Sequence, residues 1–178
     1  MPNTILRPLA LVALALVLSS CTTSKRLAFC PGITSVLDAV VVTQFKPGTA
    51  PDPSNVLYTV KVANVEGSCS YDKQGRSSSS DVDINFQAAR AVGGDAAQYN
   101  VPYFVAVSTG DRIVTKQMRS VQIEFAAGET TASVDESVKS VDLQTDHDKK
   151  PYDYQILVGL QLTKAQLDYN RAVGIFAQ

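Results

Sequence analysis

DVDINFQA, residues Asp81 to Ala88, is the stretch that decides the fold class of this chain. Apolar and polar side chains alternate along it with a period of two. The apolar positions are Val82, Ile84, Phe86 and Ala88, and the polar positions between them include Asp81, Asp83 and Asn85. Successive side chains of a β-strand point to opposite faces, so this pattern predicts a strand with one face in the core and the other in water.

The same alternation recurs outward from this stretch in both directions. Further strands are predicted at Val36–Phe45, Val56–Tyr71, Val101–Val107, Ile113–Phe125, Ser137–Leu143 and Tyr152–Leu162. The parity of the apolar positions slips by one inside Val56–Tyr71, which predicts a β-bulge near Ala63–Asn64. Val101–Val107 is apolar at both parities and is expected to be a central strand. Seven or eight strands with almost no helix predict an antiparallel sandwich, with a closed barrel as the alternative.

Turn and cap signals separate these strands. Gly75 within YDKQGR and Gly110–Asp111 within STGDR predict tight turns, and SSSS at 77–80 is expected on a hairpin surface. Only the C-terminal end is predicted to be helical. Thr163 and Gln166 form a T-x-x-Q capping box, which predicts a short helix over 164–171.

The first residues have the pattern of a secretory signal peptide. Arg7 precedes LALVALALVL, Leu9 to Leu18, a run of ten residues without charge. Such a run rises about 15 Å as a helix, about half of a hydrocarbon core, so a stable transmembrane helix is disfavoured. A charged start, a short apolar segment and small residues before a cut are typical of a signal peptide.

Leu18-Ser19-Ser20-Cys21 ends this segment and resembles the lipobox of bacterial lipoproteins. The resemblance implies that residues 1–20 are removed and that Cys21 carries acyl chains, palmitate among them. It also implies a tether at 21–29 before a domain at 30–178. Thr22, where the sorting pattern for inner-membrane retention has Asp, favours the periplasmic face of the outer membrane. The alternative is a plain secreted protein with an incidental cysteine.

FAAGET, Phe125 to Thr130, resembles the Phe-x-x-Gly-Glu-Thr turn of immunoglobulin-like sandwiches such as fibronectin-type modules. This resemblance implies an all-β, antiparallel, immunoglobulin-like sandwich of seven to eight strands, here with a short C-terminal helix. The chain contains no Trp, and Cys30 precedes the first predicted strand, so the disulfide beside a buried Trp of antibody-type domains is not expected.

Two cysteines remain once Cys21 carries lipid. Cys30 and Cys69 form an even pair, which in an oxidising compartment predicts a disulfide that staples an N-terminal arm to a strand. Two free buried thiols are the alternative. A metal site is disfavoured, because the spacing does not suit zinc and the one histidine, His147, is remote in sequence.

Charge and motifs exclude several functions. Without residues 1–20, which hold one Arg and no acid, the chain has 15 basic and 17 acidic residues, so no nucleic-acid partner is expected. His147 lies between Asp146 and Asp148, which indicates a solvated loop. DVDIN starts like a calcium loop, but Phe86 and Val92 stand where an EF-hand needs Gly and Glu. We therefore expect no catalytic residues, no metal and no cofactor.

These patterns favour a lipid-anchored cell-envelope lipoprotein that binds or scaffolds another envelope protein, held on the membrane through acyl chains on Cys21. A small-ligand or metal-binding periplasmic lipoprotein is the alternative, and an enzyme comes third. A ligand-binding protein predicts a deep apolar pocket with convergent polar groups. A scaffold predicts a filled core together with an exposed strand edge or aromatic patch.

Overall fold

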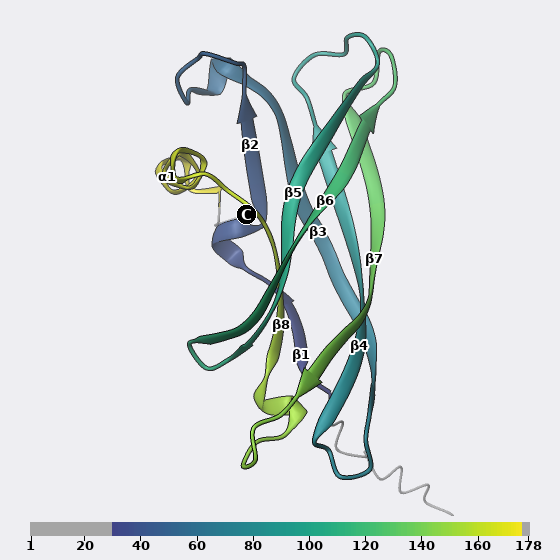
Figure 1. The fold of residues 1–178 in the computed structure, drawn as a ribbon. Coiled ribbons are helices and arrows are strands. Elements are labelled where there is room, and N and C mark those ends of the chain that lie inside the picture. The colour runs from purple at the N-terminus through teal and green to yellow at the C-terminus, as the bar shows by residue number, and fades with distance from the viewer. Residues whose placement is uncertain (1–29, 176–178) are drawn as a thin grey trace, which may run out of the picture.

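The computed structural model describes residues 30–175, so the expected signal peptide at 1–20, the lipidation site Cys21 and the tether at 21–29 lie outside the described residues. Eight strands form two four-stranded sheets that face each other as a sandwich (Figure 1). Sheet A has the order β1 (Gly32–Ser35), β8 (Gln155–Leu160), β5 (Ala97–Thr109) and β6 (Arg112–Phe125). Sheet B has the order β2 (Val41–Phe45), β3 (Val56–Tyr71), β4 (Ser77–Ala89) and β7 (Thr131–Gln144). The predicted sandwich is confirmed.

Both sheets contribute to one hydrophobic core. Val82, Ile84, Phe86 and Ala88 are all buried, as the alternation in DVDINFQA predicts. Phe86 of sheet B packs against Tyr103 of sheet A with 5.1 Å between the ring centroids. Neighbouring strands are antiparallel except β1 and β8, which pair in parallel.

Several local predictions are confirmed. Val62 pairs with Phe86 and Asn64 with Asn85, so Ala63 is the extra residue of a bulge in β3. β5 lies between β8 and β6 and is the predicted central strand. Gly75 and Gly110 sit in the predicted turns with φ of 61° and 55°, a left-handed conformation that glycine adopts without steric cost.

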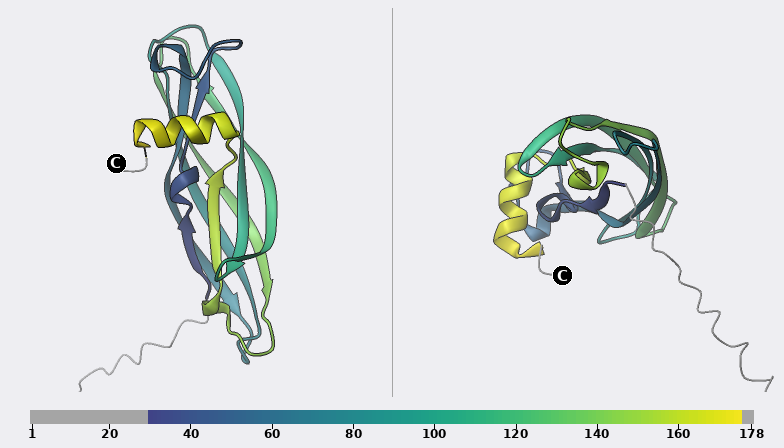
Figure 2. Two further views of the ribbon diagram at one scale, coloured as in Figure 1. Left: turned by 90° about the vertical axis from the view of Figure 1, so that its left-hand side faces the viewer. Right: turned by 90° about the horizontal axis from the view of Figure 1, so that it is seen from below.

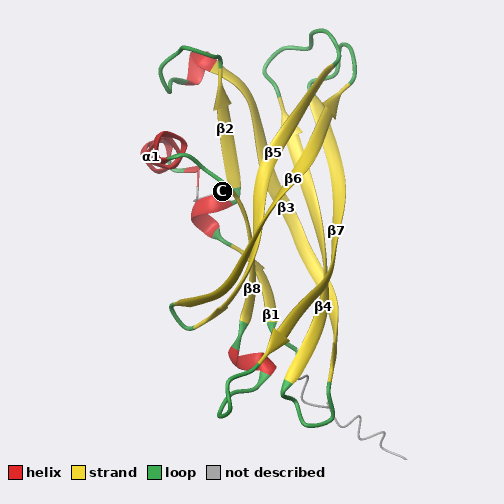
Figure 3. Ribbon diagram, in the orientation of Figure 1, coloured by secondary structure: helices red, strands yellow, loops and turns green. Residues whose placement is uncertain are grey.

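The predicted strand at Val36–Phe45 is wrong as a single element. The chain leaves sheet A after β1, makes a 3₁₀ turn at Leu37–Ala39 and enters sheet B as β2 (Figure 3). Only Val41–Phe45 of this range is a strand, and β1 (Gly32–Ser35), which lies before it, was not predicted, because four residues are too few to show an alternation.

Three other boundaries also differ from the predictions. Ser78 and Ser80 are buried within β4 rather than on a hairpin surface, because the inward parity of β4 continues into the serine run. β7 begins at Thr131 instead of Ser137, since pairing with Ala89 of β4 holds its polar first half in the sheet. β8 begins at Gln155, after a 3₁₀ turn at Pro151–Asp153.

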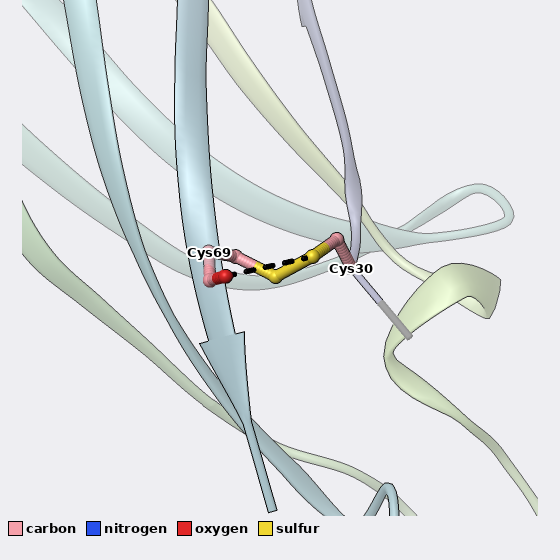
Figure 4. Close-up of a disulfide and its surroundings, with 2 residues drawn as sticks. All are labelled: Cys30 and Cys69. Carbon is pink, nitrogen blue, oxygen red and sulfur yellow. Dashed lines mark hydrogen bonds between the residues drawn. A yellow bond between two sulfur atoms is a disulfide. The ribbon is translucent and has the colours of Figure 1, made fainter. Parts of the chain in front are cut away.

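The predicted disulfide is present between Cys30 and Cys69, with 5.9 Å between the Cα atoms (Figure 4). Cys30 lies just before β1 of sheet A, and Cys69 lies in β3 of sheet B. The bond therefore ties the arm at the start of the domain to the opposite sheet, as expected from the position of Cys30 in the sequence.

Helix α1 (Lys164–Val173) begins with the predicted capping box of Thr163 and Gln166 and lies across β2 (Figure 2). The side-chain amide of Gln166 donates to the carbonyl oxygen of Thr43 at 3.2 Å, and that of Asn170 donates to the carbonyl oxygen of Val41 at 2.8 Å. The two amides are one helical turn apart, so both face the strand edge. Between residues 30 and 175, no helix is long and apolar enough to cross a bilayer.

Replacing Asn170 by Ala is expected to lower the free energy of unfolding by about 1–3 kcal/mol, because a buried carbonyl then loses its donor. Asn170 is fully buried, and its Oδ1 atom also accepts from the hydroxyl of Thr43. Urea unfolding measures the change. Asp168→Ala, on the exposed face of the same helix, is the control and should change stability by less than about 0.5 kcal/mol. Equal losses of unfolding free energy in both variants would contradict a role for Asn170 in covering the edge of β2.

Candidate functional site

The acidic residues singled out in the sequence serve contacts within the sheet. Asp81 accepts from the backbone N–H of Ser140 at 3.1 Å and lies 3.3 Å from Nζ of Lys139. These contacts, the backbone hydrogen bond first, hold the pKa of Asp81 below its usual value. Asp83 also contacts Lys139 on the outer face of β4, so the predicted water-facing side of this strand is confirmed.

The loop with the only histidine forms ion pairs at the end of the sandwich. Asp146 contacts Arg112 at 2.9 Å and Lys149 at 3.6 Å. Within the described part of the chain, no group of three or more His, Cys, Asp and Glu side chains is placed to hold a metal ion. The structure therefore does not bring His147 and its acidic neighbours together as a ligand set.

An open groove of about 670 Å³ lies on the outer face of sheet B. Residues of β3, β4 and β7 line it, among them Thr59, Gln87 and Ser133, together with Ile175 beyond α1. It is open to solvent rather than enclosed, which is unlike the deep pocket that a small-ligand protein predicts.

The tyrosines divide between core and surface as expected. Tyr103 and Tyr154 are fully buried, while Tyr152 is exposed. The ring centroid of Tyr99 lies 4.2 Å from that of Tyr58 and 6.2 Å from that of Phe125. Tyr99 therefore packs at the margin of the core and extends it. These rings do not gather into an exposed aromatic patch in the part of the chain described.

β6 differs from the other strands in its exposure. Residues Arg112–Ser120 are all exposed, whereas alternate residues are buried from Val121 to Phe125. The exposed half includes Ile113 and Met118, each with 53% of its surface accessible. We call Arg112–Ser120 the projecting half of β6, because the β5–β6 hairpin extends away from sheet B there (Figure 1).

The backbone of β6 is also open along one side. β6 is the last strand of sheet A and pairs only with β5 among the strands described. The pairing shifts between Val107 and Ser108 of β5, which leaves Val114 as an extra residue in β6; pairing is then regular from Thr115 to Phe125. An unpaired row of N–H and C=O groups is a template for another strand.

The other three edges are protected by different means. β1 has only four residues, and the side chains of α1 satisfy carbonyl groups of β2. β7 is interrupted by a bulge near Ser140, which has a φ of 56°, where one residue is inserted relative to β4. Among these four edges, that of β6 has the longest run without a bulge, Thr115–Phe125.

The projecting half is cationic. Its sequence, RIVTKQMRS, contains three basic residues and no acidic residue. Arg112 pairs with Asp146, but neither Lys116 nor Arg119 forms a salt bridge with any carboxylate of residues 30–175. Two cations without a carboxylate partner therefore flank the open edge.

The two cations lie on opposite faces of β6. Nζ of Lys116 lies 4.3 Å from the centre of the Phe104 ring and donates to Oε1 of Gln161 at 3.0 Å, so its side chain reaches back over sheet A. Arg119 lies opposite Tyr103 in the β5–β6 ladder and donates to Gln117 at 3.4 Å. Burial raises the pKa of the Tyr103 hydroxyl, and the negative charge of Glu136 raises it further. The positive charge of Arg119 acts in the opposite direction and lowers this pKa.

The alternation at Ile113–Phe125 predicts a strand but does not predict its projecting half. The available signals were the extra apolar residues Ile113, Val114 and Met118 and the run of basic residues without an acid. Alternation alone does not reveal whether a second sheet lies opposite a strand.

The fold defines the class of the protein, over the residues described, as an eight-stranded, two-sheet sandwich in which β6 ends sheet A with an uncovered edge. No family model matches the chain. No curated protein and no solved structure matches it either.

Proposed function

We propose that this protein is a lipid-anchored lipoprotein of the cell envelope whose sandwich domain binds a neighbouring envelope protein. The lipobox at 18–21 supports acylation of Cys21 and anchoring at the periplasmic face of the outer membrane. The FAAGET turn at 125–130 supports a finer assignment to the immunoglobulin-like sandwiches. Sandwiches of this kind commonly act as binding modules on cell surfaces.

The observation that carries the proposal is the open edge of β6 on an otherwise filled sandwich. Natural sheets protect long edges, because an unpaired edge invites association with other chains. This chain protects β1, β2 and β7 and leaves the projecting half of β6 uncovered. An edge kept open beside protected ones is an expected feature of a protein that binds partners.

The disulfide limits which partners are within reach. Eight residues, Thr22 to Phe29, separate Cys21 from Cys30, which is tied to β3. At about 3.5 Å each they span at most roughly 30 Å, and a flexible chain of this length extends about 15–17 Å. The proposed partner is therefore a membrane neighbour, such as an outer-membrane protein or another lipoprotein.

Site-specific photocrosslinking in living cells tests this function. A crosslinking residue in place of Met118, on the open edge, is expected to capture an envelope protein as a discrete adduct. The same residue in place of Asn85, on the outer face of sheet B, is the matched control and should give at least fivefold less adduct. Insertion of a long Gly/Ser linker after Arg26 should weaken any activity that depends on closeness to the membrane. Crosslinking from neither position would contradict a binding function, and capture mainly of cytoplasmic-membrane proteins would contradict the short tether.

A further inference from the structure

We propose that the partner presents an extended acidic segment, which adds to the free edge of β6 along Thr115–Ser120 as a fifth strand of sheet A. The segment carries two carboxylates three residues apart with an apolar residue between them. This inference rests on the proposed binding function and names the chemistry of its partner. Addition of a strand uses main-chain hydrogen bonds for affinity and alternate side chains for specificity.

The register of β5 and β6 sets the order of side chains that the added strand must present. Met118 lies directly opposite Phe104 of β5, so an apolar residue opposite Met118 would continue an apolar row across the outer face. Arg119 lies opposite Tyr103 on the other face, where the next strand would place a carboxylate beside its guanidinium. A second carboxylate on the added strand lies opposite Lys116. Because Lys116 and Arg119 are three residues apart in β6, the two carboxylates are also three residues apart in the added strand.

The charge of the edge argues for an acidic occupant over a second copy of this chain. If the β6 strands of two copies paired antiparallel along this segment, Lys116 and Arg119 of both copies would lie close together in one two-stranded ladder. No acidic residue of this segment would offset their four positive charges. Like charges on facing strands are destabilising. An acidic segment instead neutralises two cations that have no carboxylate partner elsewhere in residues 30–175.

The contacts of Lys116 keep the edge accessible. Lysine on an edge strand ordinarily discourages pairing when its side chain extends over the free edge. Here Nζ of Lys116 reaches toward Phe104 and Gln161, in the direction of β5 and β8, which is away from the free edge of β6. The backbone groups beyond it are left open, and on binding the long Lys116 side chain turns from Gln161 to meet the carboxylate of the added strand.

Binding of a designed peptide to the purified full chain tests the proposal. The probe is fluorescently labelled Thr-Val-Glu-Val-Thr-Glu-Val-Thr with blocked ends, and its matched control has Gln in place of both Glu residues. Anisotropy should show about tenfold tighter binding of the Glu peptide at low salt and a smaller preference at high salt, because exposed charges are screened. Equal affinities of the two peptides would overturn the requirement for carboxylates.

Charge reversal places the binding on the edge. The double variant Lys116→Glu/Arg119→Glu should bind the Glu peptide about tenfold more weakly, since two attractive pairs become repulsive. Lys46→Glu/Lys61→Glu makes the same change in net charge away from β6 and should alter the affinity less than twofold. Circular dichroism confirms that both variants fold. Equal losses in the two variants would overturn the assignment to this edge.

Infrared spectroscopy of a peptide with ¹³C-labelled carbonyl groups distinguishes strand addition from a purely ionic contact. The labelled amide I band should shift to a β-sheet position on binding, and binding without this shift would overturn strand addition. Crosslinking from Met118 that survives Lys116→Glu/Arg119→Glu in cells would leave the binding function in place and refute the acidic partner. Absence of crosslinking from both tested positions would instead refute the binding function itself.

Discussion

Replacing Cys21 by Ser is expected to abolish metabolic labelling with palmitate and to leave the precursor uncut before residue 21. The lipobox pattern predicts that a diacylglycerol is attached to the thiol, and a serine hydroxyl at this position does not receive it. Each buried methylene of an acyl chain contributes about 0.8 kcal/mol, so two or three chains hold a protein firmly on a bilayer. Loss of the chains should release the protein from membranes in a carbonate wash.

The matched control for this experiment is Cys30→Ser, which removes a different thiol of the same chain. That variant should retain the palmitate label and remain bound to the membrane. Labelling and membrane association that persist in Cys21→Ser would show that the anchor lies elsewhere or does not exist. Labelling lost equally in both variants would point to a defect in folding or export rather than to the acylation site.

Removal of the Cys30–Cys69 disulfide is expected to lower the free energy of unfolding by about 4 kcal/mol. The two cysteines are 39 residues apart, and closing a loop of this size removes conformational entropy from the unfolded chain. The bond also ties the start of sheet A to sheet B, so its loss frees the arm before β1. A domain of this size should lose about 8–16 °C in Tm.

Urea unfolding of the double variant Cys30→Ser/Cys69→Ser measures this effect, and the reduced wild-type protein should show the same loss. Intact mass after alkylation under non-reducing, denaturing conditions should detect no free thiol at either position in protein from the envelope. Two alkylated thiols would show that the bond does not form in the cell. A loss below about 1 kcal/mol would show that the arm contributes little to folding.

Much of the sandwich follows from local patterns. The alternation in DVDINFQA predicts which side chains of β4 are buried, and the parity slip at Ala63 predicts the bulge in β3. The capping box at Thr163 predicts the start of α1. Each of these features depends on residues within a few positions of one another, so the sequence contains its cause.

The candidate site followed from the sequence only in part. The strand at Ile113–Phe125 and its turn at Gly110 were predictable, but the open edge of β6 was not. Whether an edge is open depends on what lies beside it: α1 covers β2 from 122 or more positions away along the chain, and the interruption at Ser140 disrupts β7. No pattern within β6 shows that its own edge is left free.

The sequence by itself predicted every strand except β1, at least in part, together with the bulge, the cap, the pairing of the two cysteines and the expectation of a lipid anchor. The tertiary structure decided the change of sheets between β1 and β2, the burial of Ser78 and Ser80 and the projection of β6. The physical reason is that periodicity records which face of a strand meets an apolar surface. It does not record which distant segment supplies that surface, and where none does, as beside Arg112–Ser120, both faces of the strand are exposed.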